Sequence, residues 1–388
     1  MNQTLTVFTT ITASYADSDE LQLCLKMFSD ALPPANWVIH TPDMLVTAQA
    51  LFQQNKPTEG YVLFVKEPAL LIDKQTYPLL EKHLINDSNV IVVLPSDRRN
   101  INNKVAANYY TLRGFERYSG DCCKQSDGNL PYDDREPWVF LISAKNLKHL
   151  ILPENPFSLP AQLTREQVVI AMNAYSHPFF NYYDESRVDL LPFVPISTQS
   201  LLDVGCSRGG FAEAVKTKLH CRVSGIEMNR HEAQSAEKVL DRLWVGDVLS
   251  LEIQEQFDCI SCLDVLEHFA NPQQLLKIIR HWLTPNGRVL LNVPNVGFWA
   301  IVEDLLAGRW DYVPAGILCN THMRFYTQYS LRQLLQECGF NIITLESHRI
   351  PLPEHVEIGF NDYQKTGLRV DFDNLSTLAF TVLAEPIG

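Results

Sequence analysis

The turn LLDVGCSRGGFA at residues 201–212 constrains this chain most, because it brings bare backbone close to whatever binds there. An apolar run ends at Asp203, and a turn containing Gly205 and Gly209 leads into a helical pattern. Glycine lets backbone N–H groups approach a ligand, and a helix N-terminus favours negative charge. Ser207 occupies the second glycine position of the dinucleotide fingerprint G-x-G-x-x-G. The turn therefore predicts a nucleotide-type site that differs from the common dinucleotide site.

Strand and helix patterns alternate from this turn to the end of the chain. We expect strands at 201–206, 222–228, 242–248, 257–266, 288–295, 341–347 and 378–384. This alternation predicts an α/β fold with a mostly parallel, doubly wound sheet. Glu227 ends the second strand, where it can accept hydrogen bonds from ribose hydroxyls, and Asp247 ends the third, where it can meet an adenine amino group. Acidic residues at three successive strand ends, Asp203 included, favour a nucleoside ligand.

The chain is long enough for two domains. Residues 1–150 are expected to form an α/β accessory domain, whose first strand includes Leu5 and Val7. Residues 151–163 carry three prolines and are the expected linker. The capping-box pattern T-R-E-Q then predicts a helix over VVIAMNAY, at the start of a second domain at 164–388.

Composition excludes several classes of protein. The net charge of −13 and the lack of a basic stripe count against a nucleic-acid partner. No apolar run approaches the ~20 residues of a membrane span. The start MNQTLTVFTT lacks Lys and Arg, and the nine cysteines show no disulfide framework, so we expect a cytoplasmic protein. Cys259 and Cys262 lie on opposite faces of a predicted strand and are expected to be buried without chelating a metal.

Five stretches, in order, carry a resemblance to a known family: DVGCSRGGFA, GIEMN, GDV, CLDVLEHFANP and LTPNGRVLLNVPN. They resemble the successive motifs of class I S-adenosylmethionine-dependent methyltransferases. The resemblance implies a Rossmann-like, seven-stranded sheet with an antiparallel final strand and S-adenosylmethionine as cofactor. It implies these cofactor-binding residues: Asp203, Gly205, Cys206, Gly209, Glu227, Met228, Asp247, Val248 and Asp264.

The stretch DVLEH carries the predicted chemistry. Methyl transfer to a hydroxyl needs an aligned nucleophile, exclusion of water and removal of a proton. Glu267 and His268 are the predicted catalytic residues, with His268 as general base; a histidine that only caps the turn is an equal alternative. Together with Asp264 they resemble the acid-x-x-acid-His metal site of ubiquinone-biosynthesis O-methyltransferases. Asp replaces the first Glu of that site, so we prefer the metal-free interpretation.

An insert at 296–327 is predicted to bind the acceptor. Long loops in compact domains are usually functional, and here Trp299 can cover an apolar face while His322 and Arg324 bond hydroxyls or an anionic group. The insert resembles the T-H-x-R-F-[FY]-T stretch of bacterial methyltransferases found with polysaccharide biosynthesis, with Cys319 in place of an Asp. Further acceptor-side candidates precede the first strand of the domain: Tyr175, His177 and Tyr182.

The first 150 residues faintly resemble the nucleotide-sugar domain of family-2 glycosyltransferases. Lys66-Glu67-Pro68 stands where that family has Asp-x-Asp, and Asp17-Ser18-Asp19 is misplaced for that role, so a scaffold, dimerisation or docking role is expected. The whole sequence predicts a methyltransferase, with a homodimer as a candidate assembly, that acts on oxygen or nitrogen of a small polar metabolite or glycan precursor. Two alternatives stay open: a metal-assisted O-methyltransferase of a quinone or phenol, and a cofactor-binding scaffold without catalysis.

Overall fold

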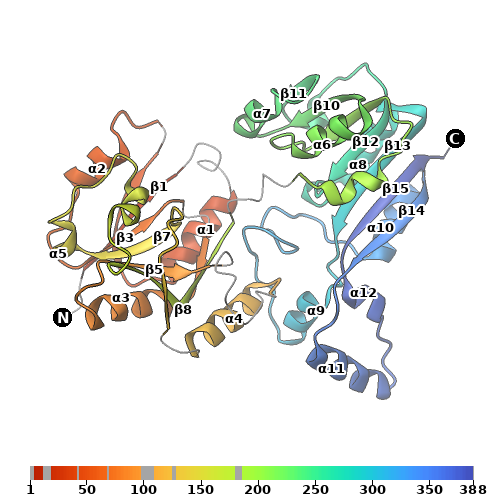
Figure 1. Cartoon of the computed structure of the whole chain (residues 1–388). Helices are drawn as coiled ribbons and strands as arrows, with labels where there is room; N and C mark the ends of the chain where they lie inside the picture. Colours follow the sequence, from red (N-terminus) through yellow and green to blue (C-terminus); the bar gives the residue numbers. More distant parts are fainter. Residues whose placement is uncertain are drawn as a thin grey trace. The chain divides into compact units, whose positions relative to one another are not determined.

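The computed structural model describes residues 4–11, 19–41, 43–67, 70–97, 109–124, 128–179 and 186–387. These residues form two units, drawn in Figure 1. We call residues 1–180 with 311–316 the N-terminal unit, and residues 181–310 with 317–388 the C-terminal unit. Every helix in the described ranges is too short or too polar to traverse a lipid bilayer.

The C-terminal unit is built on a seven-stranded sheet in the order β11-β10-β9-β12-β13-β15-β14. The strands are β9 (Ser200–Val204), β10 (Arg222–Glu227), β11 (Arg242–Val245), β12 (Phe257–Leu263), β13 (Leu283–Pro294), β14 (Phe340–Arg349) and β15 (Thr377–Pro386). Neighbouring strands from β11 to β13 are parallel, while β15 runs antiparallel to both β13 and β14. The predicted doubly wound sheet with its antiparallel final strand is confirmed.

Two apolar cores cover the two faces of this sheet. One contains Cys262 with residues of α8 and α10, and the other contains Cys259 with residues of α6. Both thiols are fully buried on opposite faces, as the period of two in a strand requires. The helices of the unit are α6 (Gly210–Leu219), α7 (Arg230–Ala236), α8 (Pro272–Trp282), α9 (Trp299–Leu306), α10 (Gln328–Glu337), α11 (Glu354–Lys365) and α12 (Phe372–Ser376).

Helices α11 and α12, between β14 and β15, were not predicted from the sequence. The signals for α11 are present, because Glu354 and Glu357 lie in its first turn and Gly367 follows its end. Short 3₁₀ turns complete the unit: η3 (Val188–Phe193), η4 (Val248–Ser250) and η5 (Leu266–His268). The η5 turn follows β12 directly and carries the predicted catalytic residues.

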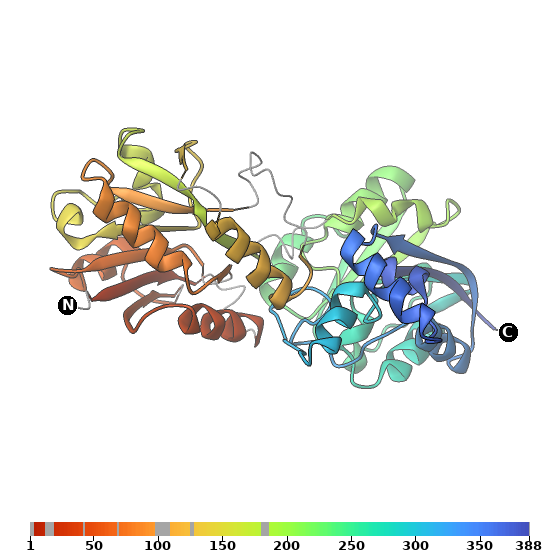
Figure 2. The same cartoon turned by 90° about the horizontal axis from the view of Figure 1, so that it is seen from below.

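The N-terminal unit has a mixed sheet in the order β2-β1-β3-β7-β5-β8-β4, with β6 paired to β8. Its strands are β1 (Leu5–Thr10), β2 (Ala35–His40), β3 (Tyr61–Val65), β4 (Leu70–Ile72), β5 (Val92–Ser96), β6 (Asn129–Pro131), β7 (Val139–Ser143) and β8 (Val168–Pro178). Its helices are α1 (Asp19–Asp30), α2 (Ala48–Gln54), α3 (Thr76–Asn86), α4 (Leu112–Lys124) and α5 (Ala144–Leu147). Figure 2 shows this unit from below, and one core includes α1 and α3 residues while another includes α2 and α5 residues. The predicted first strand is confirmed as β1.

The helix predicted over VVIAMNAY is wrong, because these residues belong to β8. The Gln167 side chain does accept a hydrogen bond from the Thr164 N–H at 3.0 Å, so the local turn of the capping box forms. The run that follows is rich in β-branched Val and Ile, which favour strands. Strand β8 pairs parallel with β5 and antiparallel with β4 and β6. Tertiary pairing therefore overrides the local helix signal.

The proline-rich segment 151–163 also differs from the predicted linker. It forms two 3₁₀ turns, η1 (Pro156–Ser158) and η2 (Pro160–Gln162), and Phe157 and Leu159 are buried in a core of the N-terminal unit. The division between the units follows residue 180 instead. Asp17, Ser18 and Pro68, from the stretches compared with a glycosyltransferase motif, lie outside the described residues.

Candidate active site

The glycine turn after β9 is shaped for close approach of backbone. Gly205 has φ +73° and Gly209 has φ +86°, conformations that side chains of L-residues rarely adopt. The N–H groups of Gly205 and Cys206 donate to the Ile226 carbonyl at 2.9 and 3.0 Å, which ties the turn to β10. A Cβ added at Gly205 would lie 2.6 Å from Cγ2 of Val265, the residue before η5. The turn and the η5 segment are therefore in direct contact.

Replacing Gly205 with alanine is expected to destabilise the C-terminal unit and weaken cofactor binding. The backbone conformation alone costs about 1–2 kcal/mol for a residue with a Cβ, and the clash with Val265 adds to it. Gly308→Ala is the matched control, because Gly308 has φ +74° and nothing within 4 Å of an added Cβ. Urea unfolding should show a larger loss for Gly205→Ala than for Gly308→Ala, and adding Val265→Ala should recover part of it. Equal losses in the two single variants would remove the packing argument.

Two carboxyl groups flank this turn and are partly shielded from water. Asp203 is 3% exposed, and the Ser261 hydroxyl donates to its Oδ1 at 2.6 Å. Burial raises the pKa of Asp203 to about 7; the Ser261 hydrogen bond opposes this, and the nearby Glu227 carboxylate adds to it. Burial also raises the pKa of Glu227, against hydrogen bonds that its oxygens accept from backbone N–H groups. An amine or hydroxyls of a ligand could offset this desolvation.

The raised pKa of Asp203 predicts a pH-dependent stability. The folded chain holds the Asp203 proton more tightly than the unfolded chain, whose ordinary pKa is 3.8. The stabilisation is therefore complete below about pH 4 and is lost as the pH rises through about 7. Urea unfolding from pH 4 to 8 should show that the wild type loses free energy of unfolding relative to Asp203→Asn over that range. Parallel pH curves for the two proteins would contradict the assignment.

The other predicted cofactor residues lie around the same edge of the sheet. Cys206 and Val248 are buried, whereas Met228 is exposed. Asp247 caps η4, accepting a hydrogen bond from the Leu249 N–H at 3.0 Å. At the end of β12, Asp264 has φ +55° and its carboxylate is held by two other side chains. The Asn292 amide donates to Asp264 Oδ1 at 2.7 Å, and Arg187 forms an ion pair with Oδ2.

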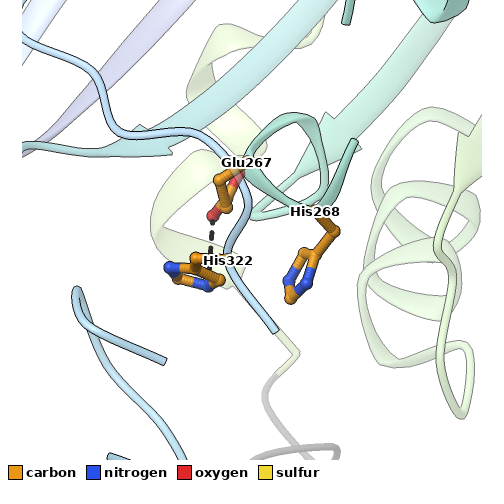
Figure 3. Close-up of side chains that lie close together, drawn as sticks. All are labelled: Glu267, His268 and His322. Atoms are coloured by element: carbon orange, nitrogen blue, oxygen red, sulfur yellow. Dashed lines mark ion pairs between the residues drawn. The ribbon is translucent and has the colours of Figure 1, made fainter. Parts of the chain in front are cut away.

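The side chains of Glu267, His268 and His322 lie close together in the predicted catalytic part of the site, as Figure 3 shows. Glu267 is completely buried, and no described residue forms a hydrogen bond with either carboxylate oxygen. Burial raises the pKa of Glu267 well above its ordinary range, and the Asp264 charge adds to this. His322 lies with its Nε2 4.0 Å from Glu267 Oε1. The two groups face each other without a hydrogen bond between them.

The tautomer of His322 follows from its other ring nitrogen. Nδ1 lies 2.9 Å from the Ile317 carbonyl, which can only accept, so the ring proton is on Nδ1. Nε2 is then a lone-pair acceptor, and it has no hydrogen-bond partner among the described residues. Burial, with His268 as the second cause, lowers the pKa of His322 to about 4. The imidazole is therefore neutral near pH 7.

His268 completes the group, which we call the Glu267–His268–His322 cluster. Its ring meets the His322 ring edge to face, with centroids 4.7 Å apart and planes at 86°. One potential ligand atom from each residue lies within 4.8 Å of the others. The insert is tied to η5 by the N–H groups of Met323 and Arg324, which donate to the Glu267 carbonyl at 2.9 and 3.0 Å. Sequence reasoning named all three cluster residues but placed His322 in a separate acceptor loop.

Tyr326 lies in the insert 296–327 and was not among the acceptor residues predicted from the sequence. Its hydroxyl is buried, and no described residue forms a hydrogen bond with it. Burial raises its pKa, and the Glu267 charge contributes in the same direction. A tyrosine among aromatics that pack a loop gives no sequence signal for a buried hydroxyl.

The remaining predicted acceptor residues have other partners. The Arg324 guanidinium donates to the Ala270 carbonyl at 2.9 and 2.6 Å, which holds the chain after η5. Trp299 is buried at the start of α9, against the Phe298 ring. Tyr175 and His177 lie on β8 of the N-terminal unit, where both contact the Tyr109 ring. Tyr182 lies outside the described residues.

The sequence of the C-terminal unit matches a known family and several curated proteins. The family described as a methyltransferase domain matches residues 175–345. The ubiquinone biosynthesis O-methyltransferase of Pseudomonas putida (strain W619) is 31% identical over 110 residues, 26% of this chain and 47% of that protein. The protein of the same name from Pseudomonas fluorescens (strain Pf0-1) is 31% identical over 123 residues, 30% of this chain and 50% of that protein. The chain thus spans about half the length of these curated relatives.

Among solved structures, a SAM-dependent methyltransferase from Archaeoglobus fulgidus matches 53% of this chain and 97% of that chain. Its TM-score is 0.39 at 16% sequence identity. The strand order, the glycine turn with its strand-end acids, and the family match point the same way. Residues 175–345 therefore match a methyltransferase domain, and the C-terminal unit has the seven-stranded sheet expected of a class I S-adenosylmethionine-dependent enzyme.

Proposed function

We propose that this protein transfers a methyl group from S-adenosylmethionine to an oxygen or nitrogen of a small polar metabolite or glycan precursor. One observation carries the proposal. The glycine turn, with Asp203 and Glu227 beside it, packs against Val265, directly before the η5 turn that holds the buried cluster. A cofactor site and a polar, water-poor reaction site therefore adjoin at the carboxyl ends of the parallel strands, where ligands bind in such sheets.

The residues of the site fit this cofactor, and different residues are assigned to different parts of it. S-adenosylmethionine, when bound, supplies a methyl group already activated by its sulfonium. We assign Asp203 to its amino group and Glu227 to its ribose hydroxyls, because each is a shielded carboxyl group at a strand end next to the turn. The positive φ of Gly205 and Gly209 lets the backbone approach the ligand without a Cβ in the way.

The Glu267–His268–His322 cluster is assigned to the acceptor. With the cofactor bound, the acceptor oxygen would take the methyl group while its O–H proton passes to the His268 imidazole, and the sulfur would keep the electrons of the C–S bond. Neutral His322 and buried Glu267 would orient the acceptor, since His322 Nε2 and both Glu267 carboxylate oxygens have no hydrogen-bond partner among the described residues. Their burial excludes water, which would otherwise compete for these groups.

A second candidate acceptor is a quinone or phenol, methylated on oxygen with help from a metal ion. The specific observation that favours it is the name of the curated relatives, ubiquinone biosynthesis O-methyltransferase. Those matches cover about half of each relative, so the acceptor of this chain needs its own measurement.

The test uses S-adenosylmethionine labelled in its methyl group. The full chain is incubated with it and with a cell extract, which is then separated into polar, lipid and macromolecular fractions, and His268→Ala serves as the control. Label in the polar or glycan fraction supports the first proposal, whereas label in the lipid fraction supports the quinone or phenol. If no fraction gains label while calorimetry shows cofactor binding, the protein is a cofactor-binding scaffold and both enzyme proposals fail.

A further inference from the structure

Two members of the Glu267–His268–His322 cluster, Glu267 and His322, carry buried electron-pair donors without a hydrogen-bond partner among the described residues. Both Glu267 oxygens and His322 Nε2 are buried, and no described residue donates a hydrogen bond to any of them. A buried polar atom left unpaired costs about 1–3 kcal/mol. Three such atoms occur here, two on the Glu267 carboxylate and one on the His322 imidazole that faces it, and the described residues leave all three unpaired. A single cation would satisfy them together.

The distances suit an ion better than a direct hydrogen bond. His322 Nε2 and Glu267 Oε1 are 4.0 Å apart, beyond the ~3.2 Å limit of an N–H···O bond. A zinc ion binds nitrogen at ~2.0–2.1 Å and carboxylate oxygen at ~2.0–2.2 Å, so tetrahedral ligand atoms lie about 3.4 Å apart. One ligand atom from each cluster residue lies within 4.8 Å of the others. Side-chain rotations that shift these ligand atoms by about an ångström would bring them to the spacing of a tetrahedral zinc site.

The surroundings of His322 match those of a metal ligand. Histidines that bind metals usually donate their other ring N–H to a carbonyl or carboxylate, which orients the ring. His322 does this through Nδ1 to the Ile317 carbonyl at 2.9 Å. The same bond directs Nε2 toward Glu267, and Figure 3 shows the two facing each other.

The ligand set differs from the acid-x-x-acid-His spacing visible in the sequence. Asp264 would be the first acid of that spacing, but its carboxylate accepts hydrogen bonds from Asn292 and Arg187. The third donor comes instead from His322, 54 residues along the chain from His268. Two imidazoles with one carboxylate are the protein ligands of several catalytic zinc sites, whereas Mg²⁺ prefers oxygen ligands.

We propose that Glu267, His268 and His322 together bind one Zn²⁺ ion, leaving a coordination position for the acceptor oxygen. This inference needs no methyl transfer to be true. If the ion is present, it would lower the pKa of a bound hydroxyl, and it would take over the role assigned above to His268 as base. The two assignments then differ in their response to metal removal.

The test measures zinc binding directly, on the full chain stripped with a chelator. Zn²⁺ is titrated in competition with a chromophoric chelator, and Co²⁺ is added separately to read the visible absorption of a tetrahedral site. We expect one equivalent of Zn²⁺ for the wild type and a loss of affinity of at least 100-fold for His322→Ala and for His268→Ala. His281→Ala, which alters an exposed histidine of α8, should bind like the wild type.

Two further arms keep the result decisive. Asp264→Asn should retain zinc, because the proposed set excludes Asp264; loss of zinc in this variant would overturn the assignment. Circular dichroism identifies any variant that fails to fold, and His322→Gln then replaces His322→Ala. Absence of stoichiometric zinc binding by folded wild type, or binding unchanged in both histidine variants, also overturns it. Cofactor affinity measured on the same samples separates this outcome from failure of the proposed methyltransferase function.

Discussion

Replacing His268 with alanine is expected to lower the rate of methyl transfer by about 100-fold or more, the usual contribution of a positioned general base. His268 is the cluster residue that is partly open to solvent, and its ring packs on His322, so it can meet the acceptor. The affinity for S-adenosylmethionine should stay within about twofold of wild type, because the assigned cofactor residues lie in the turn and on β9 and β10. Initial rates of label transfer and calorimetric cofactor titration measure the two quantities.

His281→Ala is the control for this prediction, because it removes an exposed imidazole from the last turn of α8. Full turnover in His268→Ala would remove His268 from the chemistry, both as base and as ligand. The pH dependence of wild-type turnover, measured with and without chelator, separates those two roles. A rate indifferent to chelator assigns the proton to the imidazole itself.

The second large effect is expected on cofactor affinity. Glu227→Ala should weaken S-adenosylmethionine binding by at least tenfold, which corresponds to about 1.4 kcal/mol. Glu227 accepts hydrogen bonds from the N–H groups of Ser207 and Asn229 at 2.8 and 2.7 Å. Its removal therefore loosens the turn and also removes the group assigned to the ribose hydroxyls. Hydrogen bonds to charged groups contribute about 1.5–3 kcal/mol each, so the tenfold figure is a lower bound.

Asp241→Ala provides the matched comparison for Glu227→Ala. Asp241 also accepts a backbone hydrogen bond, from the Val223 N–H at 2.8 Å, but at the opposite end of β10. The two variants should lose comparable free energy of unfolding, while only Glu227→Ala loses cofactor affinity. Calorimetry that finds equal cofactor affinity in both variants would show that Glu227 has no part in binding.

Local chemistry was enough to predict much of the C-terminal unit. The strands β9 to β13 follow from apolar runs bounded by turns, and the conformation at Gly205 follows from glycine's freedom at positive φ. The burial of Cys259 and Cys262 on opposite faces follows from the period of two along a strand. The family resemblance added the seven-stranded sheet with its antiparallel final strand, which local patterns do not contain.

Other features depended on contacts between distant segments. The capping-box turn at Thr164 and Gln167 forms, yet the next residues join a sheet because β5 and β4 offer partners on both sides. The prolines of 151–163 predicted a linker, but Phe157 and Leu159 of this segment are buried in a core of the N-terminal unit. Arg324 was predicted to bind hydroxyls or an anionic group, but its guanidinium donates hydrogen bonds to the Ala270 carbonyl.

The reaction site shows most clearly which features depend on local sequence and which depend on tertiary contacts. By itself the sequence determined the glycine turn, its strand-end acids and the polar residues of DVLEH, since each depends on neighbours a few positions away. Only the tertiary structure decided that His322 joins Glu267 and His268, while Asp264 is bound by Arg187 and Asn292. The physical reason is the distance along the chain over which each effect acts, because φ preferences and strand periodicity depend on residues only a few positions apart. The partner of a buried charge is chosen by whichever segment the fold brings within a few ångströms.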